Sequence, residues 1–472
     1  MSGRHPETVT RDQDERSPAP VPTSAEHGRR LDGTRAVAAL TDLGFAAIAA
    51  GVIARRRPVM GLLEKAQADS RALQRMRQLR REFGAGPVEL VVPGRRIVVL
   101  LDPGDVGRVL AEAPTPFHPA NREKRAALRQ FQPHGVLLSK GVVREQRRAV
   151  NEAVLDTDAP LHRLAEPFAA IIAEEAAQLL ASALQRGHLD AEHFTIQWWR
   201  MVRRLVLGER GRDDSAITDE LWRLRSAANW SFLAPPHRRR REVFTEQLYR
   251  YVERPDPNSL AGAVAAVQTG GAVDPVGQIP HWLFAFDAAG MAAQRALAVL
   301  ATHPDQQAAA TADAADPHQV HLRPYLRACV LESVRLWPTT STILRDITEP
   351  TQWRAGADSF TIAPGSALLI LVPAFHRDAD LLPFADRFAP EIWLDGQAAR
   401  YPQLVPFSAG PAECPGRNLV LFTTSTLLAH LLAAAEFRLR SGHRMSPQTP
   451  LPLTLNNFGL DFDVTRLPNV AS

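Results

Sequence analysis

The sequence predicts one large domain that is mainly α-helical and carries only small β-sheets. Three observations lead to this prediction. Apolar residues recur at helical spacing over most of the chain, the stretch 281–302 is apolar on almost every side, and the β-like runs are short. A helix that is apolar all round belongs in the middle of a large domain, where every side is covered. No internal repeat is visible, and no break in composition divides the chain after about residue 35.

The first 34 residues are polar and rich in proline, and they contain no hydrophobic stretch of the signal-peptide type. We therefore expect residues 1–34 to form a disordered tail and residues 35–472 to form the single domain. The apolar stretch 44–54 is shorter than the roughly 20 residues of a membrane helix. It predicts a helix packed on the protein body, and the chain is expected to be cytoplasmic with no membrane span.

The remaining elements follow from periodicity and from breaker residues. Helical spacing predicts helices over residues 62–83, 144–185, 281–302, 326–336 and 419–435, the fourth ended by Pro338. β-rich runs predict strands over residues 88–101, 359–362, 367–372 and 453–464, with a hairpin turn at Pro93-Gly94. The polar, basic stretch 234–241 separates two helical blocks, and residues 269–277 read as a glycine-rich loop before the long central helix.

Composition excludes several classes of protein. With 45% hydrophobic and 22% charged residues, the chain can bury a substantial core, so it is not globally disordered. Its 55 basic residues include only three lysines and are interleaved with 51 acids, without the aromatic interleaving of a single-strand groove, so no nucleic-acid partner is expected. Two cysteines, Cys329 and Cys414, cannot form a disulfide framework or a four-thiolate metal site.

The strongest local signal is the stretch 407–418, with the sequence FSAGPAECPGRN. It places Cys414 between two glycines in an irregular loop directly before an apolar helix. Glycines let the backbone approach a flat ligand closely, free N–H groups can bond a sulfur, and a helix N-terminus favours a thiolate. A small buried cysteine in a tight turn would show the same local pattern.

A second signal lies about 80 residues earlier. Glu332 and Arg335 are three residues apart on a predicted helix and so share a face, although such a pair is often only a solvated surface ion pair. Trp337-Pro338 and Arg345 follow them. This order and spacing resemble the cytochrome P450 family of haem-thiolate enzymes, whose Glu-x-x-Arg pair and Phe-x-x-Gly-x-x-x-Cys-x-Gly loop match these residues.

Further segments share the resemblance, which runs from about residue 36 to the end of the chain. Residues 373–378 look like the family's His-Arg-Asp segment, residues 388–391 like the segment that follows it, and residues 143–148 like its haem-contacting helix. The resemblance implies the cytochrome P450 fold and haem b (iron protoporphyrin IX) as cofactor. It makes Cys414 the axial thiolate ligand of the iron. The other residues that it assigns to haem binding are Phe407, Gly410, Gly416, Arg345, His376 and Arg147.

The chain departs from the family in the long helix. Ala289-Gly290 match the small-residue pair that faces the oxygen site, and we place the gap over the haem at Gly290. The acid and alcohol that usually follow are replaced by Ala292 and Ala293, and alanine has no side-chain donor or acceptor. Asp287 and Gln294 fall on other parts of the helical wheel, so neither is a convincing substitute.

Three functions remain open. The first is an ordinary monooxygenase, in which substrate hydroxyls and ordered water complete the proton relay. The second is a haem enzyme that uses peroxide, or that catalyses rearrangement or dehydration without oxygen insertion. The third is a haem-binding accessory protein with little turnover, against which intact Cys414, Glu332 and Arg335 argue.

Smaller departures concern the haem pocket itself. Ala412 stands where the family usually has a propionate-binding Arg or His, and Val143 replaces a common tryptophan. Ile392 stands where an arginine usually joins the Glu-x-x-Arg pair, and Arg387 is near enough in sequence to stand in for it. These changes predict weaker haem binding than usual.

The resemblance also predicts the substrate and the partners. A hydrophobic molecule from secondary metabolism fits the mostly apolar segments that would line the pocket. The pocket residues expected from it are Phe286, Ala289, Thr340, Asn457 and Phe458. A ferredoxin and its reductase are expected to supply electrons, docking on a basic face formed by Arg144, Arg148 and Arg417.

Overall fold

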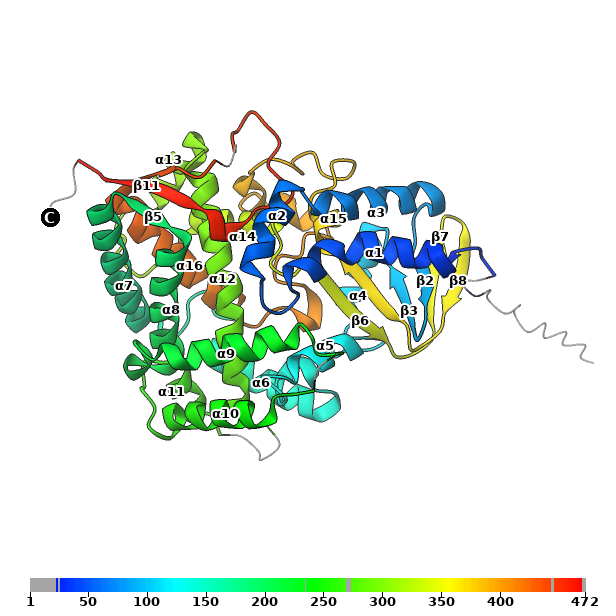
Figure 1. Cartoon of the computed structure of the whole chain (residues 1–472), viewed down its shortest axis with the longest axis horizontal. Helices are drawn as coiled ribbons and strands as arrows, with labels where there is room; N and C mark the ends of the chain where they lie inside the picture. Colours follow the sequence, from blue (N-terminus) through cyan, green and yellow to red (C-terminus); the bar gives the residue numbers. More distant parts are fainter. Residues whose placement is uncertain (1–22, 24–25, 234, 269–272, 443–444, 469–472) are drawn as a thin grey trace, which may run out of the picture.

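A computed structural model of the protein describes residue 23 and residues 26–233, 235–268, 273–442 and 445–468. A large helical body makes up one side of the molecule, and a β-rich part lies beside it (Figure 1). Each part has its own hydrophobic cluster. The prediction of a mainly helical protein with small sheets is confirmed.

The helices cover most of the stretches predicted from periodicity. They are α1 (Gly33–Ala50), α2 (Arg57–Lys65), α3 (Asp69–Phe83), α4 (Pro103–Ala111), α5 (Arg122–Leu128), α6 (Gly141–Leu155), α7 (Ala165–Arg186), α8 (Ala191–Leu207), α9 (Ser215–Ala228), α10 (Arg238–Glu253), α11 (Leu260–Ala265), α12 (Ile279–Leu300), α13 (Pro304–Asp313), α14 (Pro324–Leu336), α15 (Val372–His376) and α16 (Arg417–Ala434).

The strands form three small sheets. They are β1 (Arg30–Leu31), β2 (Val88–Val92), β3 (Arg95–Val99), β4 (Phe117–His118), β5 (His188–Asp190), β6 (Thr342–Ile347), β7 (Thr351–Ala355), β8 (Asp358–Ile362), β9 (Ala367–Leu371), β10 (Ala435–Leu439) and β11 (Asp461–Arg466). The largest sheet has the order β1-β2-β3-β9-β6-β4, in which β2 and β3 form the predicted hairpin and β3 pairs with β9 in parallel.

Helix α12 lies in the middle of the helical body, as its all-round apolar sequence predicts (Figure 1). Every residue from Ala289 to Leu300 is buried, and the helix packs against α8, α14 and α16. Pro280 falls in its first turn, where a missing N–H costs nothing. The centre of the protein is therefore a cluster of helices that brings the 332–335 and 414–417 segments to α12.

Several predicted boundaries are wrong. The predicted helices 62–83 and 144–185 are each two helices, α2 with α3 and α6 with α7. Residues 1–22 and 24–25 of the predicted tail lie outside the described residues, but the rest of it is ordered. Arg30–Leu31 pairs with β2, and the buried Arg29 guanidinium donates to the carbonyls of Pro87 and Gly86. In the predicted strand 453–464, only the part from Asp461 onward is a strand. The apolar residues before it are buried by packing without any strand pairing.

Two helices in the described part of the chain are long and apolar enough to cross a membrane. They span Ala165–Arg186 and Val276–Leu300, and 44% and 78% of their most apolar windows are buried inside the protein. Core helices of soluble proteins have the same length and composition, so this finding is weak evidence for a membrane span.

Candidate functional site

The Cys414 loop has a fixed backbone just before α16. The Cys414 N–H donates to the Phe407 carbonyl at 2.9 Å, which closes the loop. Gly410 has a φ of +65°, and a Cβ there would lie 2.2 Å from the carbonyl oxygen of Leu110, so only glycine fits. At Gly416 a Cβ would meet only Leu155, at 3.8 Å, so there is open space beside the backbone two residues after Cys414.

Two opposing effects act on the Cys414 thiol. Burial raises its pKa, while the N–H of Gly416 bonds the sulfur and lowers it. The N-terminus of α16 follows three residues later, and its dipole also favours a negative sulfur. The sulfur thus has a donor and a helix end on one side, the surroundings that a thiolate ligand requires.

Helix α6 holds the loop from outside. Arg144 donates to the carbonyl of Pro411 at 3.4 Å, and Arg148 donates to that of Glu413 at 2.6 Å. Arg144 is only 9% exposed, so it is not part of the basic docking face predicted from the sequence. Arg148 also pairs with Glu152 at 2.5 Å, and Arg417, about half exposed, pairs with Glu413 at 3.4 Å. Of the three predicted arginines, only Arg417 is thus substantially exposed, and a neighbouring carboxylate offsets part of its charge.

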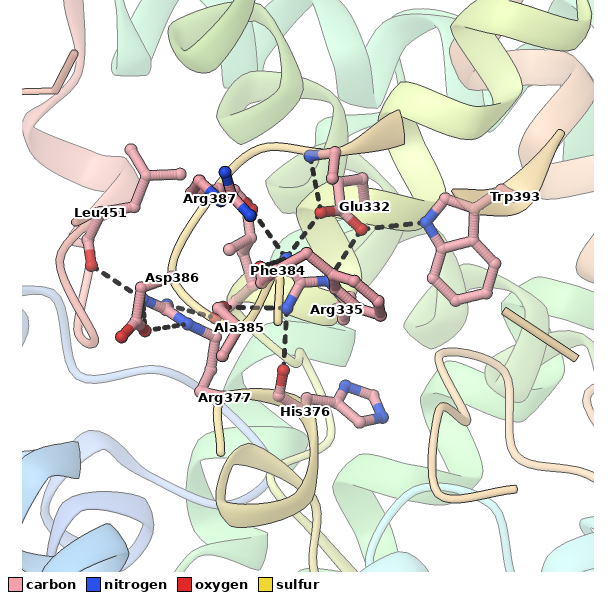
Figure 2. A network of polar contacts seen from close by, with 12 residues as sticks. Glu332, Arg335, His376, Arg377, Phe384, Ala385, Asp386, Arg387, Trp393 and Leu451 are labelled. Atoms are coloured by element: carbon pink, nitrogen blue, oxygen red, sulfur yellow. Dashed lines mark hydrogen bonds and ion pairs between the residues drawn. The ribbon is translucent and has the colours of Figure 1, made fainter. Parts of the chain in front are cut away.

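Glu332 and Arg335 form a buried ion pair, and neither side chain has any exposure. The Arg335 guanidinium donates to both carboxylate oxygens of Glu332, at 2.8 and 2.6 Å (Figure 2). It also donates to four backbone carbonyls of the segment 376–387, those of His376, Phe384, Ala385 and Arg387. This pair is thus a structural clamp on an irregular segment, in contrast to a solvated surface pair.

The remaining bonds to Glu332 come from Ala389, in the predicted segment 388–391, and from Trp393, which the sequence analysis did not single out. The indole Nε1 of Trp393 and the N–H of Ala389 each donate to its carboxylate at 2.9 Å (Figure 2). Arg387 does not substitute for the missing arginine with its side chain, since its guanidinium donates to Pro383 at an exposed position. Trp393 directly follows Ile392, the position at which an arginine usually joins the Glu-x-x-Arg pair. This neighbouring position was the sequence signal that could have pointed to Trp393 as a partner of Glu332.

Trp393→Phe is expected to lower the free energy of unfolding by about 1.5–3 kcal/mol, because one bond to a buried carboxylate is lost. The measurement is urea unfolding followed by circular dichroism. Leu394→Ala, at the exposed neighbouring position, is the control and should change stability by less than about 0.5 kcal/mol. Equal stability of the two variants would show that the indole bond contributes nothing.

Several basic side chains that have few hydrogen-bond acceptors lie close together near the Cys414 loop. Arg345 on β6 is 3% exposed, donates through Nη1 only to the carbonyl of Leu344, and its buried Nε has no partner among the described residues. Burial and the neighbouring Arg144 lower its pKa to about 10. Burial and Arg345 lower the pKa of Lys124, which donates to Pro119, to about 7. Buried cations that repel one another fit the anionic propionates of a haem.

Two other predicted haem-binding residues have different surroundings. His376 is fully buried, its Nε2 accepts the N–H of Val405, and its Nδ1 has no partner among the described residues. Burial and Arg335 lower its pKa to about 3. Arg147 donates to the carbonyl of Val273 and to the hydroxyl of Ser139. On α6 it is Arg144 that lies beside Arg345, one turn earlier than the sequence match indicates.

The missing side chain of Gly290 makes room for Trp198. A Cβ on Gly290 would lie 2.7 Å from Nε1 of this indole. Trp198 on α8 donates to the carbonyl of Phe286, and the two rings are 6.3 Å apart. Phe286 therefore packs toward Trp198 on α8. Its neighbour Phe284 instead contacts Phe131, at 5.6 Å between ring centroids.

The positions of the usual acid and alcohol are tightly enclosed. Ala289, Ala292 and Ala293 are all buried, Ala293 completely. The hydroxyl of Ser333 on α14 donates to the carbonyl of Ala292 at 2.8 Å, so a serine on the next helix fixes this backbone.

The polar neighbours on α12 are already engaged. Asp287 pairs with Arg225 at 2.6 Å, and the side-chain oxygen of Gln294 accepts from Asn457 at 3.2 Å. Of the other predicted pocket residues, Thr340 is exposed, and Phe458 lies under the guanidinium of Arg57. Asn457 is buried against α12, which the apolar pattern alone did not indicate.

Known proteins are similar in sequence to the part of the chain that contains these residues. The family model for cytochrome P450 matches residues 286–460, which contain Glu332, Arg335, Arg345 and Cys414. The chain is 28% identical over 159 residues to probable cytochrome P450 4s3 of Drosophila melanogaster, covering 33% of this chain and 31% of that protein.

Two named monooxygenases are also similar. Drimenol monooxygenase of Persicaria hydropiper is 32% identical over 129 residues, covering 27% of this chain and 25% of that protein. Cyclooctat-9-en-7-ol 5-monooxygenase of Streptomyces melanosporofaciens is 32% identical over 118 residues, covering 25% and 24%. The aligned part thus spans a quarter to a third of the length of these relatives. The clamped Glu332–Arg335 pair and the Cys414 loop thus lie in the same segment, residues 286–460, which matches the family model for cytochrome P450.

Proposed function

We propose that the protein is a cytoplasmic haem-thiolate monooxygenase that holds haem b and oxidises a hydrophobic molecule of secondary metabolism. The observation that carries the proposal is the Cys414 loop, with its sulfur bonded by the Gly416 N–H and its backbone held by Arg144 and Arg148. Two similar proteins are named as monooxygenases, which supports the same reaction class.

Each part of the chain has a distinct role in this proposal. Haem, when bound, supplies the iron at which molecular oxygen is activated with two electrons and two protons. The Cys414 thiolate would bind the iron, and Arg345 with Arg144 and Lys124 would neutralise the propionates. The Glu332–Arg335 clamp fixes the segment that supports the Cys414 loop. A ferredoxin and its reductase supply the electrons, and an acidic partner would compete with Glu413 for the half-exposed Arg417.

A second candidate is a haem enzyme that uses peroxide or catalyses a reaction without oxygen insertion. The enclosed Ala292 and Ala293 favour it, because neither side chain can hold or move a proton. Asp287 and Gln294 are already bonded to Arg225 and Asn457. In the monooxygenase, the protons must therefore come through water or through the substrate's own hydroxyl groups.

The first test is the absorption spectrum of the purified, dithionite-reduced protein under carbon monoxide. A strongly red-shifted Soret band is the expected result, because a thiolate ligand at the iron produces it. Haem-free protein, or a band at the unshifted position of a neutral ligand, would contradict the proposal and leave the accessory function.

Ala293→Thr then tests how protons reach the oxygen site in the proposed monooxygenase. If water alone carries the relay, we expect more product per oxygen consumed, because a threonine hydroxyl adds a donor at this enclosed position. If the substrate already fills this space, productive oxygen use should fall. The measurement is the ratio of product to oxygen consumed with ferredoxin and reductase present. An unchanged ratio and unchanged product would exclude this position as the relay site.

A further inference from the structure

Two histidines from distant parts of the chain meet at helix α16. His430 lies on α16 and is 7% exposed, whereas His318 is exposed in the turn after α13. Their ring centroids are 5.0 Å apart, and the ring planes are inclined by 71° to each other. Such a ring contact is ordinary for two aromatic side chains, so the nitrogen atoms decide what else this pair can do.

The buried ring has a nitrogen without a partner. Nε2 of His430 is buried and has no hydrogen-bond partner among the described residues. Burial, together with His318 and Arg323, lowers the pKa of His430 to about 4, so the ring is neutral at neutral pH and keeps a lone pair on one nitrogen. A buried polar atom without a protein partner is rare and is commonly satisfied by water or an ion. A neutral imidazole is also the commonest protein ligand of transition metals.

The loop that carries His318 is held in place from inside. The guanidinium of Arg323, which is 1% exposed, donates to five backbone carbonyls from Asp313 to Gln319, at 3.0 to 3.3 Å. The carboxylate of Asp313 also accepts the N–H of Leu326 at 2.9 Å. The backbone on both sides of His318 is thus anchored, so a ligand that binds there has little loop to order.

The distance between the two rings fits a shared metal ion. Zinc lies about 2 Å from the nitrogen of a histidine ligand, and so about 3 Å from the ring centre. Two imidazoles at the tetrahedral angle on one ion then have centroids about 5 Å apart. The 5.0 Å between His318 and His430 matches this arrangement. Among the described residues no three His, Cys, Asp or Glu side chains form a metal-binding group, so water would fill the other positions beside the exposed His318.

The charges around the pair also suit a cation. Burial lowers the pKa of Arg323, and Asp313 and Asp316 offset part of this lowering. Two carboxylates are therefore near the one guanidinium that acts on His430, and its N–H groups are already bonded to carbonyls. Imidazole ligands favour zinc and its first-row neighbours over magnesium and calcium, which prefer oxygen.

We propose that His318 and His430 together bind one zinc ion, which joins the loop 313–319 to helix α16. Both histidines lie outside the Cys414 loop and the Glu332–Arg335 clamp, so the site is separate from the proposed reaction. An ion that binds only the folded chain stabilises it. Here the ion would fasten a surface loop to the helix that begins three residues after Cys414.

The test is isothermal titration calorimetry of the untagged full-length protein with zinc chloride. We expect one ion per chain, and binding at least about tenfold weaker in His318→Ala. His318→Phe keeps a ring against His430 but has no lone pair, so it should lose the ion as well. Because residue 318 is exposed, both variants should fold. His430→Phe, whose fold is checked by circular dichroism, should lose the ion in the same way.

The matched control is His193→Ala. The side chain of His193 is 43% exposed and its Nδ1 lies 2.9 Å from the carboxylate of Asp190, a surface pair where adventitious zinc would collect. This variant should bind zinc like the unchanged protein. Thermal unfolding is the second readout, since zinc should raise the midpoint of the unchanged protein and of His193→Ala but not that of His318→Ala.

Three outcomes would overturn the proposal. The first is an unchanged protein that takes up no zinc. The second is a phenylalanine variant, at either histidine, that binds zinc as tightly as the unchanged protein, because the ring contact alone would then explain the pair. The third is loss of the ion in His193→Ala, which would place the zinc at the surface pair with Asp190.

Discussion

Replacing Arg335 with leucine is expected to lower the free energy of unfolding by more than about 4 kcal/mol, which is enough to unfold many domains of ordinary stability. The change leaves the Glu332 carboxylate buried without its cation. It also removes the donor from four backbone carbonyls between His376 and Arg387. Urea unfolding followed by tryptophan fluorescence measures the effect, and loss of soluble protein is its extreme form.

Two further variants separate the clamp from charge in general. Arg438→Leu breaks an exposed pair with Glu436 and should change stability by less than about 0.5 kcal/mol. Arg335→Lys keeps the charge but cannot serve the same carbonyls with one ammonium, so an intermediate loss is expected. If Arg335→Leu unfolds at the same urea concentration as Arg438→Leu, the buried network does not stabilise the fold.

Cys414→Ala is expected to abolish the red-shifted band of the reduced carbon monoxide complex and to reduce product formation to background. The thiol is the only group removed, and the backbone bond from residue 414 to the Phe407 carbonyl is kept, so the fold should survive. The measurements are the carbon monoxide spectrum, product formation with ferredoxin and reductase, and far-ultraviolet circular dichroism.

The matched control is Cys329→Ala, at a fully buried cysteine on α14. Burial and nearby carboxylates raise the pKa of that thiol, so it stays protonated and is no candidate ligand. The control should lose some stability through the small cavity but keep the spectrum. A red-shifted band that persists in Cys414→Ala would show that another group ligates the iron.

The fold was predictable where pattern and packing agree. Helix α12 is apolar over its whole length because it lies at the centre of the helical body, so periodicity alone identified it. The hairpin of β2 and β3 carried its own turn signal at Pro93-Gly94. The strand predicted over residues 453–460 is wrong because a buried loop can be as apolar as a strand. Only Asp461–Arg466 pairs with other strands.

The site was predictable in its sequence motifs and less so in its orientations. The position of Gly290 within its helix does not predict that it packs on Trp198, because Trp198 lies on α8, almost a hundred residues earlier in the chain. Likewise, the rotation of α6 decides that Arg144, and not Arg147, lies beside Arg345. The role of Trp393 depends on the carboxylate of Glu332, which is distant in sequence but within hydrogen-bond distance of the indole in the fold. Spacing indicates which residue types are present, whereas tertiary packing decides which of them meet.

The clamp also has a consequence for the order of folding. Arg335 bonds carbonyls 41 to 52 residues further along the chain, so these contacts form only after a long loop has closed, at a cost in chain entropy. His376 in the same segment accepts from Val405, which lies just before the Cys414 loop. Helices with local contacts form first, and such distant contacts follow. The segment 376–387 and then the cysteine loop should therefore be the last parts to assemble, so that cofactor loading coincides with completion of the fold.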